Sequence, residues 1–260
     1  MNDFGNDGSH DATRPAIVDA VVLAAGKGTR MKSDLAKVLH PLAGRPLVHH
    51  VLDVVRSAAI DRTVMVVGHQ ADRVQAACPG DDLVFVVQEP QLGTGHAVMQ
   101  AEPHLREGGY TLVLAGDVPL LRSATVRRLV DAAVAGQDAA VVLTCVVEDA
   151  DRYGRIVKDG AGRVQRIVEA RDATPAELLI GEYNTGVFCY RTDALREALA
   201  HLTTDNDQQE YYLTDTVAYL VQRGLTVGAV ATDDPDEAVG INTVDELAAA
   251  EDILNRRGPA

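Results

Sequence analysis

The residues of this chain most suited to chemistry lie in one short segment that combines glycine with positive charge. This segment and the lysine that follows it supply two glycines and three cations: Gly26, Gly28, Lys27, Arg30 and Lys37. Glycines let a backbone turn sharply and bring bare N–H groups close to a ligand, and cations beside those N–H groups attract anions. The combination indicates phosphate binding. On this segment alone, a solvated basic loop between a strand and a helix remains the alternative.

The spacing within the segment excludes two better-known phosphate motifs. The dinucleotide fingerprint needs a third glycine where Met31 stands, and a P-loop needs Gly-Lys-Ser or Gly-Lys-Thr after a longer spacer. The apolar run at residues 21–23 comes directly before the segment and predicts a strand covered on both faces. Phosphate-binding residues are therefore expected at the carboxyl end of a buried strand.

Composition limits the partners and the compartment of the protein. The chain has 260 residues, which suits one large α/β domain or two small ones, and a formal net charge of −14. This charge opposes binding to nucleic acid or to an anionic membrane. No apolar stretch reaches the roughly 18 residues of a membrane span, and the acidic start is unlike a signal peptide, so a cytoplasmic protein is expected. Cys78, Cys145 and Cys189 lack metal-ligand spacing and are expected to be reduced packing residues.

Alternating strand and helix patterns predict the scaffold. Strands are expected near residues 17–23, 63–67, 83–87 and 111–115, and helices near 46–58, 70–77, 95–105 and 123–135. Repeated strand–helix units imply parallel strands with right-handed crossovers and a ligand crevice at the carboxyl ends of the strands. Residues 1–15 are polar and are predicted to be a disordered leader. Residues 16–260 are predicted to form a single domain.

The pattern changes between residues 139 and 190. The segments 139–147, 156–158, 163–168 and 183–190 are rich in strand-forming residues, and turn residues join the second to the third. We predict that residues 139–190 form an inserted, largely antiparallel lobe that covers one side of the cleft. Helices near 193–201, 210–223 and 243–257 and a strand near 225–231 complete the expected fold.

Further motifs follow the basic segment in a fixed order along the chain. They are residues 88–97 (QEPQLGTGHA), 114–120 (LAGDVPL), 153–156 (YGRI), 167–174 (IVEARDAT), 182–187 (EYNTGV), 209–215 (QEYYLTD) and 240–243 (GINT). With these motifs the chain, over roughly residues 18–257, resembles the bacterial N-acetylglucosamine-1-phosphate uridylyltransferases, the uridylyltransferase half of GlmU-type enzymes. The resemblance implies an α/β nucleotidyltransferase fold with a Rossmann-like mixed sheet, in which the inserted antiparallel lobe at residues 139–190 covers the sugar side of the cleft.

The resemblance also implies an activity, a cofactor and partners. The implied enzyme joins UTP to N-acetylglucosamine-1-phosphate, forms UDP-N-acetylglucosamine and pyrophosphate, and uses Mg²⁺, as a step in making cell wall precursors. Its partners are these small molecules. Two alternatives stay open: the same chemistry with another NTP or another sugar-1-phosphate such as glucose-1-phosphate, and a non-catalytic regulatory subunit that binds nucleotide sugars. A monomer or small homo-oligomer is expected.

Site residues follow from the same resemblance. The catalytic cations are Arg30 and Lys37. The nucleotide site is assigned to Leu23, Ala24, Ala25, Gly26, Lys27, Gln88, Gly93, Thr94 and Gly116. The sugar site is assigned to Gly154, Glu169 and Asn184, and the Mg²⁺ ligands to Asp117 and Asn242.

Some of these positions have other interpretations. Asp117 is also a common turn residue, and Asn242 could cap the last helix. Ala115 and Arg171 depart from the family pattern, because relatives carry a hydroxyl-bearing residue at the first position and often lysine at the second. The identity of the sugar is therefore left open.

Bifunctional relatives continue into a β-helix of six-residue repeats that acetylates glucosamine-1-phosphate. No such period occurs in this sequence. The expectation is a chain without an acetyltransferase domain, and without that activity.

Overall fold

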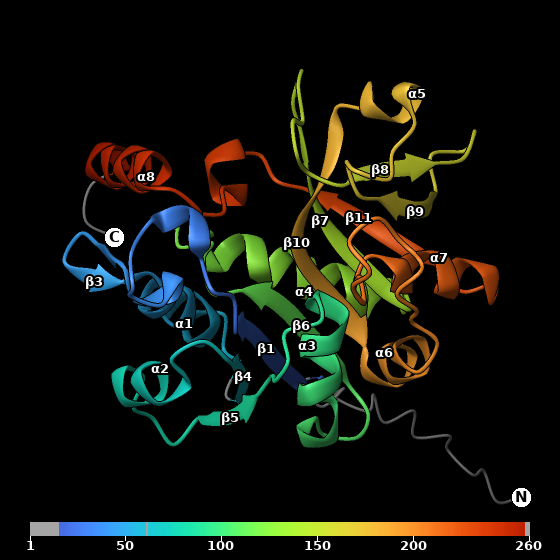
Figure 1. The fold of residues 1–260 in the computed structure, drawn as a ribbon. Coiled ribbons are helices and arrows are strands. Elements are labelled where there is room, and N and C mark those ends of the chain that lie inside the picture. Colours follow the sequence, from blue (N-terminus) through green and yellow to red (C-terminus); the bar gives the residue numbers. More distant parts are fainter. Residues whose placement is uncertain (1–15, 61, 258–260) are drawn as a thin grey trace, which may run out of the picture.

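The structure is a computed structural model that describes residues 16–60 and 62–257 (Figure 1). The predicted leader, residues 1–15, lies outside the described residues. A central sheet has the strand order β11-β7-β10-β6-β1-β4-β5. Its strands are β1 (Val18–Ala24), β4 (Thr63–Val67), β5 (Leu83–Val87), β6 (Tyr110–Ala115), β7 (Ala140–Val146), β10 (Glu182–Arg191) and β11 (Val227–Ala231). Along this path β10 runs antiparallel to both neighbours, and the other pairings are parallel.

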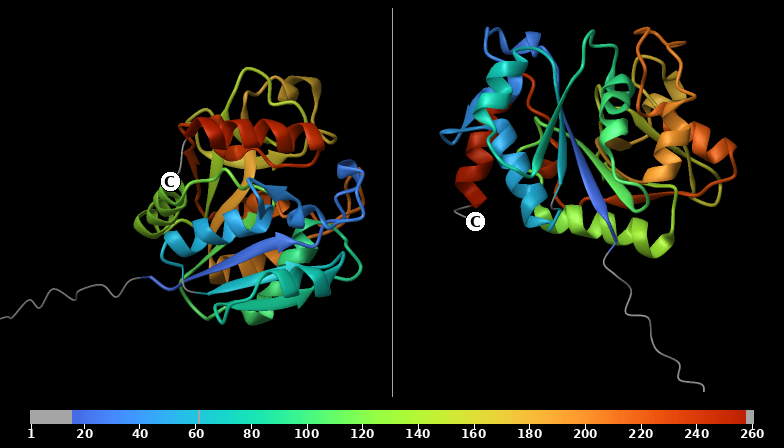
Figure 2. Two further views of the ribbon diagram at one scale, coloured as in Figure 1. Left: turned by 90° about the vertical axis from the view of Figure 1, so that its left-hand side faces the viewer. Right: turned by 90° about the horizontal axis from the view of Figure 1, so that it is seen from below.

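Helices cover both faces of the sheet (Figure 2). One face carries α1 (Leu47–Ser57), α2 (Ala71–Ala77) and α4 (Ser123–Gly136), and the other carries α3 (Thr94–Ala101), α6 (Thr192–Leu199) and α7 (Asp215–Gln222). Successive residues of β1 divide between the two cores, with Ala20 and Val22 in the first and Val21 in the second. The continuous apolar run of β1 is thus explained by burial on both sides.

The segment 139–190 is divided between the central sheet and a projecting part. β7 and β10 belong to the central sheet, whereas the hairpin of β8 (Arg155–Lys158) and β9 (Val164–Val168) projects beyond it with α5 (Pro175–Leu178) (Figure 1). Six of the seven residues of β7 are buried, so this strand needs cover on both faces, which the helical layers provide. The strands of segment 139–190 thus pair antiparallel with one another, as predicted, but two of them, β7 and β10, lie within the central sheet.

The remaining elements are short, apart from the last helix. They are α8 (Val244–Arg257), the strands β2 (Pro41–Leu42) and β3 (Arg45–Pro46), and the 3-10 turns η1 (Thr29–Met31), η2 (Lys37–Leu39), η3 (Glu102–His104) and η4 (Pro235–Ala238). One predicted helix, 210–223, begins later than expected, at Asp215. The reason is tertiary: Tyr211 donates its backbone N–H to Leu92 and accepts from Gly95, so this stretch is extended across the start of α3.

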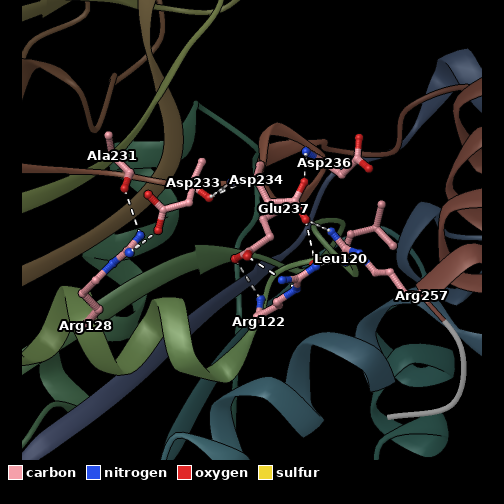
Figure 3. A network of polar contacts seen from close by, with 10 residues as sticks. Leu120, Arg122, Arg128, Ala231, Asp233, Asp234, Asp236, Glu237 and Arg257 are labelled. Carbon is pink, nitrogen blue, oxygen red and sulfur yellow. Dashed lines mark hydrogen bonds and ion pairs between the residues drawn. The ribbon is translucent and has the colours of Figure 1, made fainter.

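Arginines hold η4 and the residues before it in place (Figure 3). Arg122, at the start of α4, donates to Asp234 at 2.8 Å and lies 3.6 Å from buried Glu237. Arg257, at the end of α8, donates to Asp234 at 2.8 Å and to the carbonyl oxygen of Leu120 at 2.8 Å. These contacts fix the chain just before it enters the segment that contains Asn242.

The structure also bears on the cysteines and on helices that could cross a membrane. All three cysteines are buried and free, as predicted. Across residues 16–60 and 62–257, no helix is both long enough and apolar enough to cross a membrane.

Candidate active site

A pocket of about 340 Å³ opens at the carboxyl ends of β1 and β6. Seven of the predicted nucleotide-binding residues line it: Leu23, Ala24, Ala25, Gly26, Gln88, Gly93 and Thr94. Lys27 and Gly116 do not. Lys27 is exposed on the loop, and Gly116 is buried behind the pocket, where its N–H donates to the Leu23 carbonyl oxygen at 2.9 Å.

The glycines of the basic loop have different roles. Gly28 has a φ of 62°, and a Cβ there would lie 2.5 Å from Cβ of Lys37. Glycine is therefore required at position 28 for two reasons: the positive φ of the backbone and the closeness of the Lys37 side chain. Gly26 lacks a positive φ, and no heavy atom lies within 4 Å of where its Cβ would be. The sharp turn predicted for both glycines forms at Gly28, and Gly26 offers open space at the pocket.

Four predicted phosphate- and metal-binding side chains meet beside the pocket. Lys37 Nζ donates to Asp117 Oδ2 and, at 3.1 Å, to Asn242 Oδ1. Arg30 Nη2 donates to the same Asn242 oxygen at 2.8 Å. The side chains of Lys37 and Asp117 are 17% and 11% exposed, so water screens this ion pair only partly. Arg30, Lys37, Asp117 and Asn242 thus meet from distant parts of the chain. We call these four residues the phosphate-binding cluster, after their predicted role.

The loop at residues 240–242 aims the amide oxygen of Asn242 into this cluster. Asn242 Nδ2 donates to the Gly240 carbonyl oxygen at 2.9 Å, and a carbonyl can only accept, so Oδ1 must point the other way. The Ile241 N–H donates to the backbone oxygen of Asp117 at 2.9 Å, which holds the loop against the end of β6. One carboxylate and one amide oxygen that contact the same ammonium group form a donor set that fits Mg²⁺.

Gln88 presents one defined face to the pocket. This buried side chain donates from Nε2 to the Gly93 carbonyl oxygen at 2.9 Å, and Nε2 also lies 3.1 Å from His96 Nδ1. Its amide N–H groups are therefore used within the protein. Oε1, a hydrogen-bond acceptor, is left for a ligand.

The start of α3 is covered by the chain segment at residues 210–213. Gly93 has a φ of 104°, and a Cβ there would lie 2.6 Å from the Tyr211 carbonyl oxygen, so this close approach requires glycine. The N–H of Gly95 donates to Tyr211 at 2.7 Å, and Thr94 Oγ1 accepts from Leu213 N at 3.1 Å. The Gly95 N–H is thus used within the protein.

The pocket also contains polar residues that sequence reasoning missed. Gln91 and Glu210 both line it. Gln91 lies in the motif at residues 88–97 and Glu210 in the motif at residues 209–215. Their positions in these motifs could have identified them as candidate site residues. Their side chains could not be oriented without knowing that segment 209–213 crosses α3.

The structure also brings the three predicted sugar-binding residues together. The Asn184 N–H donates to the Gly154 carbonyl oxygen at 2.8 Å, and a Cβ on Gly154 would lie 3.4 Å from Glu169 Oε2. Asn184 Oδ1 accepts from Gly186 N at 2.9 Å, across an irregularity in β10. Among the described residues the N–H groups of the Asn184 amide have no hydrogen-bond partner, so they can donate to a ligand.

A second pocket of about 450 Å³ is lined both by Glu169, one of the predicted sugar-binding residues, and by residues of the basic loop. It is lined by Thr29, Arg30, Arg152, Glu169, Ala170, Arg171 and Gln208. Arg30 thus contacts Asn242 and also lines the pocket that contains Glu169. Burial raises the pKa of the Glu169 carboxyl group, the Thr214 hydroxyl that donates to it at 2.9 Å opposes this, and nearby Asp215 and Asp172 add to it.

The chain is similar in sequence to a known family of domains and to curated proteins. A family model described as a MobA-like NTP transferase domain matches residues 20–218. The chain is 49% identical over 238 residues to a bifunctional protein GlmU from Desulfitobacterium hafniense (strain DSM 10664 / DCB-2). It is 51% identical over 240 residues to the protein of that name from Burkholderia thailandensis. Each match covers 92% of this chain and 52% of the relative, so the chain spans about half the length of these relatives.

Solved structures share the fold at low sequence identity. A UDP-glucose pyrophosphorylase complexed with UDP-glucose superposes with a TM-score of 0.75 at 16% identity, covering 93% of this chain and 100% of that one. A putative glucose-1-phosphate thymidylyltransferase from Bacillus anthracis, complexed with a sucrose, gives 0.72 at 19% identity, covering 91% and 94%. These matches confirm the predicted nucleotidyltransferase fold.

Proposed function

This chain belongs to the family of MobA-like NTP transferase domains, and on that premise we propose that it is a uridylyltransferase that makes UDP-N-acetylglucosamine from UTP and N-acetylglucosamine-1-phosphate. The observation that carries the proposal is the meeting of Arg30, Lys37, Asp117 and Asn242 between the pocket at Gln88 and the pocket at Glu169. A transfer between a nucleotide and a sugar phosphate needs such cations between two binding pockets.

The reaction forms one P–O bond and breaks another. A phosphate oxygen of the sugar-1-phosphate attacks the α-phosphorus of UTP, and the bond from that phosphorus to the oxygen of the β-phosphate breaks, so that pyrophosphate leaves with the bonding electrons. The attacking oxygen is already anionic at neutral pH, so no side chain has to remove a proton. Catalysis then consists of bringing anions together in line and stabilising the charge of the transition state.

Lys37 and Arg30 supply that stabilisation in our proposal. The Lys37 ammonium group is assigned to the α-phosphate and the Arg30 guanidinium group to the phosphates that leave. Both already contact anionic or carbonyl oxygens in the structure, so phosphate oxygens would replace partners of the same kind. Asp117 and Asn242 would hold Mg²⁺, which when bound neutralises phosphate charge.

Base selection is assigned to Gln88. Its Oε1 can only accept a hydrogen bond, and the imide N–H of uracil donates one, whereas the equivalent nitrogen of cytosine is an acceptor. Two facing acceptors in a closed site are unfavourable. Thymine keeps the imide N–H, so discrimination against dTTP is expected to be weaker than discrimination against CTP.

The test is pyrophosphate release across a panel of substrates. UTP with N-acetylglucosamine-1-phosphate should give the highest kcat/KM, ahead of UTP with glucose-1-phosphate and of CTP with either sugar. Equal kcat/KM for UTP and CTP would reject the role of Gln88. A preference for glucose-1-phosphate would keep the chemistry and change the sugar, and absence of turnover with any pair would reject the enzyme.

A further inference from the structure

Glu246, in the first turn of α8, is tied to the turn that contains Asn242. Its Oε2 accepts from the backbone N–H of Asn242 at 2.6 Å and of Thr243 at 3.1 Å. The Thr243 hydroxyl accepts in return from Glu246 N at 3.1 Å, which completes a capping box. This carboxylate oxygen thus fixes the backbone that places the Asn242 amide oxygen in the phosphate-binding cluster.

The other oxygen of the same carboxylate reaches the sugar side. Glu246 Oε1 accepts from Arg152 Nη2 at 2.5 Å. The Arg152 guanidinium group lies 5.4 Å from the centre of the Tyr153 ring, and that ring stacks on Tyr183 at 4.5 Å. The next residue, Gly154, bonds to Asn184. Arg152 also lines the pocket that contains Glu169.

This ion pair differs from an ordinary surface pair. The Glu246 and Arg152 side chains are 22% and 42% exposed, and an isolated pair with such exposure contributes little to stability. Here, however, one oxygen of the carboxylate is held by two backbone N–H groups while the other holds the guanidinium group. The pair therefore joins two backbone segments whose residues are 94 apart in sequence, one beside the proposed Mg²⁺ ligand and one beside the proposed sugar site.

We propose that Glu246 is a positioning residue that acts through Arg152 to couple Mg²⁺ binding to sugar binding. The inference rests on the proposed function. Because the Glu246–Arg152 contact connects the Asn242 turn to the loop at residues 152–154, order imposed on one segment favours order in the other. Coupling of this kind is reciprocal, so Mg²⁺ strengthens binding of the nucleotide sugar by the same factor as the nucleotide sugar strengthens binding of Mg²⁺.

Matched variants separate this coupling from a direct contact. Glu246→Gln keeps an oxygen that can cap the helix and removes the charge, and Arg152→Gln removes the guanidinium group. Arg45→Gln serves as control, because Arg45 forms a 2.7 Å ion pair with Asp53 away from both pockets. For each protein, and for the Glu246→Gln/Arg152→Gln double variant, calorimetry gives the Kd of UDP-N-acetylglucosamine with and without Mg²⁺, and thermal unfolding reports folding.

The expected result is a loss of coupling with folding retained. In wild type and Arg45→Gln, Mg²⁺ should strengthen binding of UDP-N-acetylglucosamine by about 10-fold. This factor should be clearly smaller in both single variants, with no further loss in the double variant, and the part that remains reflects the direct attraction between Mg²⁺ and the diphosphate. If Glu246→Gln retains the wild-type factor, or if only Arg152→Gln weakens binding, the inference is overturned and the proposed function stands. If wild type binds no UDP-N-acetylglucosamine, the proposed function fails and the inference fails with it.

Discussion

Lys37 is the residue on which the proposed chemistry depends most directly. Its ammonium group contacts Asp117 and Asn242, and Lys37 and Asp117 both line the pocket that contains Gln88. Loss of one preorganised cation at a phosphoryl transition state costs on the order of 3 kcal/mol, so Lys37→Ala should lower kcat by about two orders of magnitude or more. Steady-state pyrophosphate release at saturating substrates measures this.

A lysine from the same loop provides the control for this prediction. Lys32 is exposed, and Lys32→Ala should leave kcat within about twofold of wild type. Circular dichroism and thermal unfolding would establish that both variants fold. A folded Lys37→Ala protein with nearly full kcat would show that this lysine has no catalytic role.

Asp117 carries the prediction about metal. It is buried at the end of β6, and its carboxylate is half of the proposed Mg²⁺ donor set. Asp117→Asn removes a negative charge from that set, so the Mg²⁺ concentration for half-maximal rate should rise about 10-fold or more while kcat falls. A Mg²⁺ titration of both proteins measures the two effects, and undiminished activity of wild type in excess EDTA would reject the metal requirement.

Glu169 should give the enzyme a pH dependence on the sugar side. Burial raises the pKa of this carboxyl group above its usual 4.5. As pH falls through that raised pKa, the carboxylate is protonated and loses part of its capacity to accept from sugar hydroxyls, so KM for the sugar phosphate should rise. The substrate phosphate also titrates, near pH 6, and contributes to the profile of every variant.

Glu169→Gln separates these two titrations because glutamine is neutral throughout. The profile of the variant should retain the part due to the substrate phosphate and lose the part due to Glu169. The raised pKa of Glu169 also makes the stability of the protein depend on pH. Its contribution to the stability of the folded state is fully present below the pKa that Glu169 has in the unfolded chain, and it is lost as pH rises through the higher pKa of the folded state. Identical KM profiles for wild type and Glu169→Gln would contradict the assignment.

At the scale of elements, the loop between β1 and η1 lies close against Lys37, which packs directly beside Gly28. Gly28→Ala would impose an unfavourable φ of 62° and place a Cβ 2.5 Å from Cβ of Lys37. Gly44 has a φ of 77°, but no heavy atom lies within 4 Å of where its Cβ would be. Both alanine variants should lose about 1 kcal/mol of stability from the backbone.

Only Gly28→Ala should also lower kcat, since the lysine side chain has to move. A displacement of about 1 Å at a reacting centre can lower the rate by about 100-fold. Denaturant unfolding and kcat measured on the two variants would separate backbone strain from misplacement of Lys37. Equal kcat values for the two variants would mean that the contact does not position the lysine.

Element boundaries could be predicted closely where local pattern decides them. Strands β4 and β5 match their predicted residues, and most helices begin and end within a few residues of prediction. The start of α7 was missed because a long-range contact, Tyr211 with Leu92 and Gly95, keeps residues 210–212 out of the helix. Local pattern also could not show that β7 and β10 belong to the central sheet. A buried strand has the same apolar sequence pattern whichever strands it pairs with.

The candidate site could be predicted as a set of residues but not as a geometry. The family resemblance selected Arg30 and Asn242, yet their 2.8 Å contact joins residues 212 apart, and no spacing rule connects them. The role of Glu246 escaped prediction for the same reason. Within its own helix it forms an ordinary capping box, and only the fold brings Arg152 to its second oxygen.

At the scale of the whole molecule, both pockets belong to one continuous sheet. The proposed nucleotide pocket lies at the ends of β1 and β6, and Asn184, on the proposed sugar side, lies on β10, which pairs with β6 through Phe188 and Val113. The same pairing places Cys189 opposite Leu112, deep in the core. A substrate bound across these strands therefore contacts a structure that is expected to unfold cooperatively.

Thermal unfolding with ligand tests this cooperativity. A ligand at about 100 times its Kd that binds only the folded state adds about 2.7 kcal/mol, which for a domain of this size raises Tm by roughly 5–10 °C. With UTP and Mg²⁺ present, we expect one transition that moves as a unit, because the nucleotide pocket and the sugar side share strands. CTP at the same concentration should raise Tm less, since the cytosine ring nitrogen that corresponds to the imide N–H of uracil has no hydrogen to donate to the Gln88 oxygen. Two transitions in calorimetry, of which only one moves with UTP, would show instead that the projecting hairpin and β10 unfold independently of the nucleotide pocket.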